Sequence, residues 1–204
     1  MNISLDVLKK YGVCNSGIEC FKYLKTTTVH ETINKCMDLS DDVVLRWTDD
    51  KLDKYRWCNW LLSRILPRGK KIKYAIYSAR LVIDIFEKEY PNDNRPRKAI
   101  EVAELYLEGK VTKEQIRDAT AAAAAAVDAV DAAYAAYAAN AAYAAAAAAA
   151  ANAAYAAYAT YATYAAYAAA DAAANAAANA DRKEIFKSII TYGLTLIEES
   201  EVVE

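Results

Sequence analysis

Residues 121–180 read AAAAAAVDAV DAAYAAYAAN AAYAAAAAAA ANAAYAAYAT YATYAAYAAA DAAANAAANA, and 41 of these 60 residues are alanine. Alanine is the best helix former, and neither Gly nor Pro interrupts the segment. One helix of this length would run roughly 90 Å, at about 1.5 Å per residue. We therefore expect two or three packed helices, with turns at Asn140 and Asn152, because Asn tolerates the left-handed conformation.

Tyrosines recur at three-residue steps within this segment, at Tyr155, Tyr158, Tyr161 and Tyr164. Each such step rotates by about 300° on an α-helix, so the rings spiral around the axis and form no single stripe. A spiral suits a helix with neighbours on several sides, with some rings wedged between helices and others partly in solvent. A drifting codon repeat under a loose demand for helicity would give the same pattern, and that alternative stays open.

Helix start and stop signals divide the residues before this segment. Ser16 and Glu19 have the spacing of a capping box, which predicts a helix start at Ser16. Another short helix is expected to begin at Thr28 or Val29 and to run to Met37. Thr48 is the expected cap of a longer helix that Pro67 stops.

The same signals continue toward the alanine-rich segment. Apolar residues at three- and four-residue spacing predict one helix over residues 71–90. Pro96 is placed in the first turn of the next helix, and Gly109 marks its end. Thr112 and Gln115 form a second capping box, from which the alanine-rich region starts.

No alternating apolar run appears, so the predicted fold class is all-α. We expect a multi-helix bundle with alanine-rich, closely packed C-terminal helices. The expected organisation is an N-terminal helical region over residues 1–69, a helical domain with the alanine-rich helices over residues 70–180, and a C-terminal helix and tail over residues 181–204.

Charge and residue usage limit the partners and cofactors. The 25 Lys and Arg residues nearly balance 27 Asp and Glu residues, for a net charge of −2, which gives no electrostatic footprint for nucleic acid. The uncharged residues 132–170 could span a bilayer in length. Tyr and Asn lie in the middle of that span, however, so we expect no membrane segment. The start of the chain has no secretory signal pattern, and we expect a cytoplasmic protein.

The four cysteines are Cys14, Cys20, Cys36 and Cys58. None has the two-residue spacing of a zinc or redox motif, so we interpret them as reduced apolar residues. An exposed Cys14 is the alternative. His30 is the only histidine, and no Gly-rich phosphate loop is present. We therefore expect no metal, no cofactor and no catalytic activity.

Two groups of residues are candidates for ligand or partner binding. Arg80, Arg95 and Arg97 could face an anion; alternatively Arg95 bonds Asp84, Glu87 or Glu101 and fixes the angle between two helices. Asp171, Asn175 and Asn179 share a helix face at four-residue spacing, which could bind a polar ligand or simply keep that face in water. The candidate binding residues are Arg80, Arg95, Arg97, Glu101, Asp171 and Asn175.

A distinctive pattern runs from the middle of the chain into the alanine-rich region. It consists of Phe86-Glu87, Tyr90-Pro91-Asn92-Asp93, the segment RPRKAIE at 95–101, a helix ending at Gly109, Ile116-Arg117 and the alanine-rich run. In this pattern residues 72–180 resemble the immunity-protein family of bacterial toxin–immunity systems. The chain as a whole also resembles phage-encoded proteins of the same architecture. Family members often carry His in the alanine-rich helices, and this chain has none there.

The resemblance implies a protein that binds and neutralises something, and three functions are weighed. The first is a non-catalytic inhibitor, immunity-like or acting in phage counter-defence in the host-cell cytoplasm, with a protein partner. The second is a module that sequesters a small anionic ligand such as a nucleotide signal. The third is an assembly protein that uses alanine helices for close packing and forms homo-oligomers.

Overall fold

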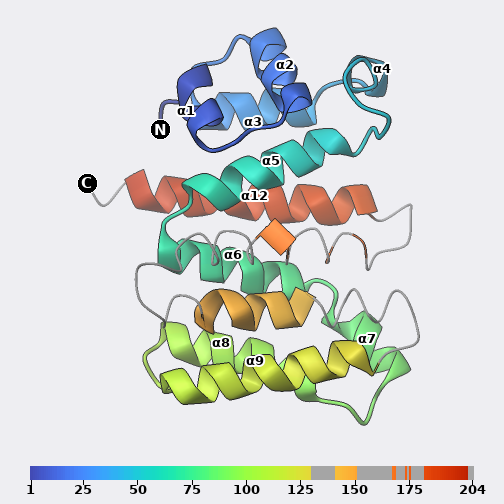
Figure 1. The fold of residues 1–204 in the computed structure, drawn as a ribbon, viewed down its shortest axis with the longest axis vertical. Coiled ribbons are helices and arrows are strands. Elements are labelled where there is room, and N and C mark those ends of the chain that lie inside the picture. The colour runs from blue at the N-terminus through green and yellow to red at the C-terminus, as the bar shows by residue number, and fades with distance from the viewer. Residues whose placement is uncertain (130–140, 151–166, 169–172, 174, 176–181, 202–204) are drawn as a thin grey trace.

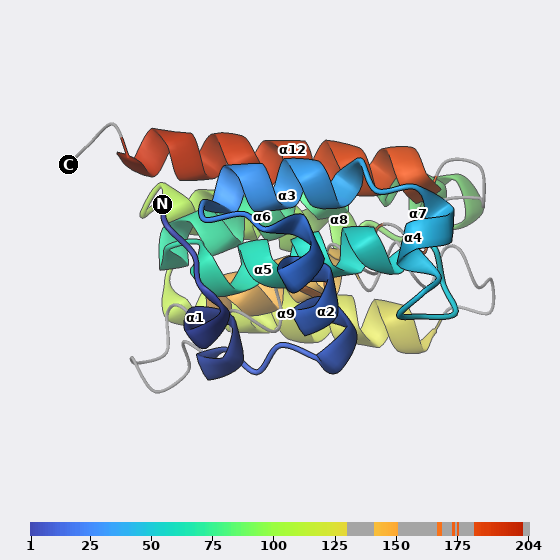
Figure 2. The ribbon, with the colours of Figure 1, turned by 90° about the horizontal axis from the view of Figure 1, so that it is seen from above.

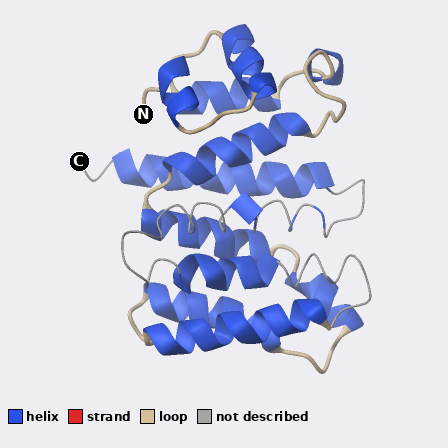
Figure 3. Cartoon of the chain, in the orientation of Figure 1, coloured by secondary structure: helices blue, strands red, loops and turns tan. Residues whose placement is uncertain are grey.

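The computed structural model describes residues 1–129, 141–150, 167, 168, 173, 175 and 182–201. All regular elements among these residues are helices (Figure 3), and the β-structure among them is one isolated antiparallel bridge between Asn2 and Thr28. The prediction of an all-α fold is confirmed. No helix in the described part of the chain is both long and apolar enough to cross a membrane.

Most of the helices lie across the long axis of the molecule and are stacked one upon another along it (Figure 1). A layer of α1, α2 and α3 covers one end of the stack, as Figure 2 shows from above, and α8 and α9 lie at the other. Residues 141–150 form a further helix. The helix bounds are α1 Leu5–Lys10, α2 Asn15–Leu24, α3 Val29–Met37, α4 Asp41–Val44, α5 Asp53–Ile65, α6 Arg68–Arg80, α7 Ile83–Glu89, α8 Arg95–Leu107, α9 Lys113–Asp128 and α12 Arg182–Glu201.

The last helix of the chain, α12, lies between two helices that are consecutive in sequence. It packs against both α5 and α6 (Figure 1). Phe186 stacks on Tyr55 of α5 with ring centroids 5.9 Å apart, and Tyr192 stacks on Tyr77 of α6 at 4.1 Å. Because α12 contributes to the core on both sides, the C-terminal helix forms one packed stack with α5 and α6.

The alanine-rich region is not one uninterrupted helix. Helix α9 ends at Asp128, where Ala129 is the C-cap residue. Residues 141–150 are buried around almost the whole helix, as expected for a helix without a polar face, and Figure 1 shows them in the middle of the stack. The expected turns at Asn140 and Asn152 and the four tyrosines from 155 to 164 lie outside the described residues.

Several predicted helix ends are confirmed. The hydroxyl of Thr28 accepts from the Glu31 N–H at the start of α3. Thr112 and Gln115 form both bonds of a capping box, at 3.2 and 2.8 Å. Pro96 lies in the first turn of α8, and Gly109, which follows the C-cap of α8, has a φ of +71°.

Two predicted helix starts are wrong. Helix α2 begins earlier than predicted, because the Cys14 sulfur, in place of Ser16, accepts from the Gly17 N–H at 3.4 Å. Helix α5 does not begin at Thr48. The Asp50 carboxylate accepts from the Leu52 N–H at 2.9 Å, and such local side-chain bonds compete with the helix.

The helix predicted over residues 71–90 is two helices. Val82, with φ −130° and ψ −2°, interrupts the helical conformation between α6 and α7. The break buries both Val82 and Ile83 and leaves Leu81 at the surface. A continuous helix would turn these three consecutive residues to different sides, so the gain in apolar burial favours the break.

Candidate functional site

Arg97, on the first turn of α8, joins α8 to α7. Its Nη2 donates to Glu87 at 2.6 Å and to Asp84 at 3.3 Å, and its Nε donates to the other Glu87 oxygen. The bond from Arg97 lowers the pKa of Glu87 below its usual value of 4.5. Two parallel N–H···O bonds fix the geometry of this pair, and the pair therefore fixes the orientation of α7 relative to α8.

Arg80, at the end of α6, forms a similar pair with Glu104 of α8. Nε and Nη2 donate to the two carboxylate oxygens at 3.0 and 2.7 Å. Both side chains are 37% exposed. The carboxylate of Glu101 acts at longer range on Arg80 and Arg97 and favours their charged forms. These residues form one mixed-charge network across α6, α7 and α8.

Arg95 does not join that network. Its guanidinium donates to Asp93 at 2.6, 2.9 and 3.1 Å, and its backbone N–H also donates to Asp93. The prediction that Arg95 bonds Asp84, Glu87 or Glu101 is therefore wrong, because the carboxylate two residues before it is within reach. Since each of the three guanidiniums is already held by a carboxylate, Arg80, Arg95 and Arg97 do not converge on a common anion.

The second predicted group is only partly described. Asn175 is helical and half-buried. Asp171 and Asn179 lie outside the described residues.

A groove of about 530 Å³ lies beside Arg80, between α6, α8 and α12. The stacked rings of Tyr77 and Tyr192 line it, together with Lys73, Arg80 and Glu104. Arginine and tyrosine are enriched in protein–protein interfaces. The groove combines the aromatic surface of two stacked tyrosines with charged groups of both signs, as is common in such interfaces.

A second hollow, of about 310 Å³, lies between the N-terminal layer and α5. Sequence reasoning missed it, although one signal was present: every cysteine and tryptophan of the chain lies between residues 14 and 60. Cys14 is exposed, as in the alternative considered above, while Cys20, Cys36 and Cys58 are buried; all four are free thiols. The four cysteines, Trp57 and Trp60 all line this hollow.

Among the described residues, no three His, Cys, Asp or Glu side chains gather closely enough to hold a metal ion. The described residues define an all-α stack with surface ion pairs, a groove beside Arg80 and a hollow beside Trp57. Residues 64–192 match the family model described as "Imm-5 like putative immunity protein", and the chain belongs to that family. No curated protein and no solved structure matches the chain. Membership of this family suggests a non-catalytic, protein-binding role.

Proposed function

We propose that the protein is a non-catalytic inhibitor that neutralises a protein toxin by direct contact. The observation that carries this proposal is the family match over residues 64–192. The matched residues include α6, α7, α8 and α9 and the first half of α12. The proposal therefore concerns chiefly the part of the stack from α6 to α12.

The groove beside Arg80 is the contact surface that we propose for the partner. All of its lining residues fall inside the matched range, from Lys73 to Tyr192. The pairing of Arg80 with Glu104 and the stacking of Tyr77 on Tyr192 hold these side chains in place before binding. Preorganised side chains lose less conformational entropy on association, which favours affinity.

The resemblance to phage-encoded proteins favours an immunity-like or counter-defence role in the cytoplasm of a bacterial host. In that setting the partner would be a host or competitor toxin.

Two other functions remain as alternatives. A small anionic ligand at Arg80, Arg95 and Arg97 would have to displace a carboxylate from each guanidinium, which makes this alternative the weaker one. An assembly protein built on alanine helices would form large oligomers. Thermal shifts with nucleotides test the first alternative, and light scattering tests the second.

The proposed function is tested by crosslinked capture of the partner from native host cells, followed by co-expression of the captured protein with this chain. We expect the partner to arrest growth alone and growth to recover on co-expression. The variant Arg80→Glu places a carboxylate opposite Glu104 and should abolish the recovery. The control variant Lys22→Glu, on α2, should not. A captured protein that is harmless to cells would contradict the proposal.

A further inference from the structure

The hollow between the N-terminal layer and α5 is a second site, distinct from the proposed partner groove. It has a volume of about 310 Å³, and its walls come mainly from residues 8–61, which precede the range 64–192 matched to the family. Protein interiors contain few voids larger than a water molecule, and ligand pockets begin at about 300 Å³. A hollow of this size therefore has the volume of a small-molecule site.

The walls are aromatic and aliphatic. Trp57 and Trp60 of α5 and Phe21 and Leu24 of α2 line the hollow, and Val13 contributes from the turn before α2. Indole and phenyl rings offer flat apolar surfaces, against which aromatic groups stack or pack edge to face. The walls therefore favour a planar apolar ligand.

Three buried cysteines, Cys20, Cys36 and Cys58, also line the hollow. The sulfur atoms of Cys20 and Cys36 are 3.7 Å apart, and the Cys58 thiol contacts the Ile33 carbonyl oxygen. The hydrogen bond with Cys36 and burial together raise the pKa of the Cys20 thiol. Thiols in this state behave as small apolar groups and offer no charge to a ligand.

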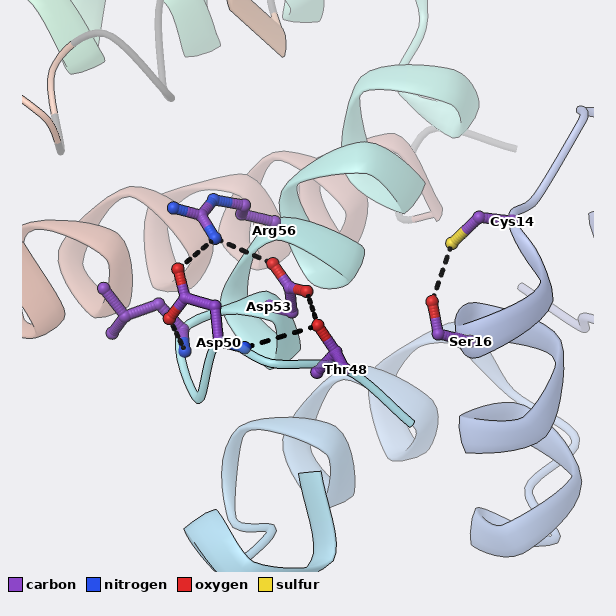
Figure 4. A network of polar contacts seen from close by, with 7 residues as sticks. Cys14, Ser16, Thr48, Asp50, Asp53 and Arg56 are labelled. Carbon is purple, nitrogen blue, oxygen red and sulfur yellow. Dashed lines mark hydrogen bonds and ion pairs between the residues drawn. The ribbon is translucent and has the colours of Figure 1, made fainter. Parts of the chain in front are cut away.

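At the rim, one guanidinium lies between two carboxylates (Figure 4). Nη1 of Arg56 donates to Asp50 at 2.6 Å and to Asp53 at 2.7 Å. Burial opposes ionisation of Asp50, but the Leu52 N–H and Arg56 hold its pKa below the usual value. With two carboxylates around one guanidinium, this rim has no excess positive charge with which to attract an anion.

A second polar group stands at the start of α2. The Cys14 sulfur and the Ser16 hydroxyl oxygen are 3.4 Å apart (Figure 4), and both residues line the hollow. A thiol and a hydroxyl can exchange a hydrogen bond with a ligand N–H or O–H. A few polar groups around an apolar cavity are the usual means of orienting a small ligand.

We propose that this hollow binds a neutral, two-ring aromatic small molecule of about the size of indole. An apolar cavity of about 150 Å³ is large enough for benzene, and the hollow has about twice that volume. Its apolar walls and buried thiols match an apolar ligand, and its rim, with two carboxylates around one guanidinium, does not favour an anion. This site is independent of the partner groove, and either can exist without the other.

The test uses the full-length chain and indole, with binding measured by calorimetry. We expect saturable binding with a dissociation constant below about 1 mM, which corresponds to about −4 kcal/mol. A parallel titration uses 5-nitroindole as a quencher of tryptophan emission. The chain has three tryptophans; Trp57 and Trp60 line the hollow, and Trp47 lies 6.4 Å from Trp57 between ring centroids. Bound quencher should therefore remove most of the emission.

Two variants on α2 locate the binding. Ser16→Phe places a ring in the mouth of the hollow and should weaken indole binding at least tenfold. Glu19→Phe adds the same ring at an exposed position on the same helix and should leave binding unchanged. Circular dichroism and melting curves establish that both variants are folded.

Three results would overturn the proposal: no indole binding by the folded wild-type chain, equal binding by Ser16→Phe and wild type, or binding of naphthalene sulfonate in preference to indole and naphthalene. The last result would mean that the site selects an anion.

Discussion

The phenol of Tyr74 on α6 donates a hydrogen bond of 3.0 Å to the side-chain carbonyl oxygen of Asn59 on α5. Both residues are fully buried. The Asn59 amide in turn donates to the backbone oxygen of Tyr167 at 3.2 Å. Burial raises the pKa of the Tyr74 phenol well above its usual value, so it remains a protonated donor. This polar link joins α5 and α6, the two helices on which α12 packs.

Replacing Tyr74 with Phe should destabilise the fold, because the Asn59 oxygen then stays buried without this donor. We expect a loss of about 1–3 kcal/mol in the free energy of unfolding, measured with denaturant. Tyr23→Phe removes a hydroxyl from a side chain that is 49% exposed, and its effect should stay within about 0.5 kcal/mol. Equal effects of the two changes would show that the link to Asn59 carries no stability.

Gly193 is required where α12 crosses the neighbouring helices. A Cβ at Gly193 would lie 2.7 Å from Leu62 and 2.8 Å from the Tyr74 ring, and both of these side chains are fully buried. Gly193→Ala should therefore cost about 1–3 kcal/mol through overpacking. Gly69 of α6 has no atom within 4 Å of its added Cβ, so Gly69→Ala should stabilise the protein by up to about 1 kcal/mol. Thermal unfolding of both variants tests the packing of α12, and a tolerated Ala at 193 would contradict it.

Arg97 should contribute more stability than Arg95, because Arg97 joins two helices and Arg95 bonds a residue two positions away. At neutral pH we expect Arg97→Ala to cost up to about 1 kcal/mol and Arg95→Ala to cost less. Since Arg97 lowers the pKa of Glu87, the stability from this pair is present above pH 4.5 and is lost as the pH falls through the lowered value. Denaturant curves at pH 7 and pH 3 should show the wild type and Arg97→Ala converging in acid; a constant gap would exclude the ion pair as its cause.

Lys71 should make stability depend on alkaline pH. It is 8% exposed, and burial followed by the charges of Arg64 and Arg68 lowers its pKa from 10.5 to about 8. The unfolded chain then binds more protons than the folded one between pH 8 and pH 10.5, so folding becomes more favourable as the pH rises through this window. Relative to Lys71→Met, the free energy of unfolding of the wild type should rise by on the order of 2 kcal/mol between pH 8 and pH 10.5.

The measurement is the free energy of unfolding of both proteins at pH 7, 9 and 10.5. Lys22→Met, at an exposed position, controls for the general loss of one lysine. A difference between wild type and Lys71→Met that does not change with pH would contradict the assigned pKa.

The sequence predicted features that depend on neighbours within one helical turn. Thr112 and Gln115 satisfy each other's backbone groups over three residues, so their capping box was recognisable. The break at Val82 was not predictable in this way, because it depends on what Val82 and Ile83 bury against in the folded stack. The partners of Arg97 lie 10 and 13 residues earlier in the chain, and only the meeting of α7 with α8 brings them together.

The hollow beside Trp57 and Trp60 was missed for the same reason. Its walls come from separate helices, and a cluster of Cys and Trp in sequence gives no sign of whether it fills a core or leaves a cavity. The position of α12 between α5 and α6 likewise rests on contacts between helices more than 100 residues apart in the chain, which no local pattern records.

The central claim, inhibition by contact without catalysis, is tested most directly by titrating a fixed amount of the captured toxin with this protein and measuring residual toxin activity. Contact inhibition predicts a linear fall that reaches its plateau at a fixed whole-number ratio of the two proteins, together with recovery of activity when the complex is dissociated. Complete, irreversible loss of toxin activity at a small fraction of an equivalent would mean that the protein acts catalytically, and would contradict the account.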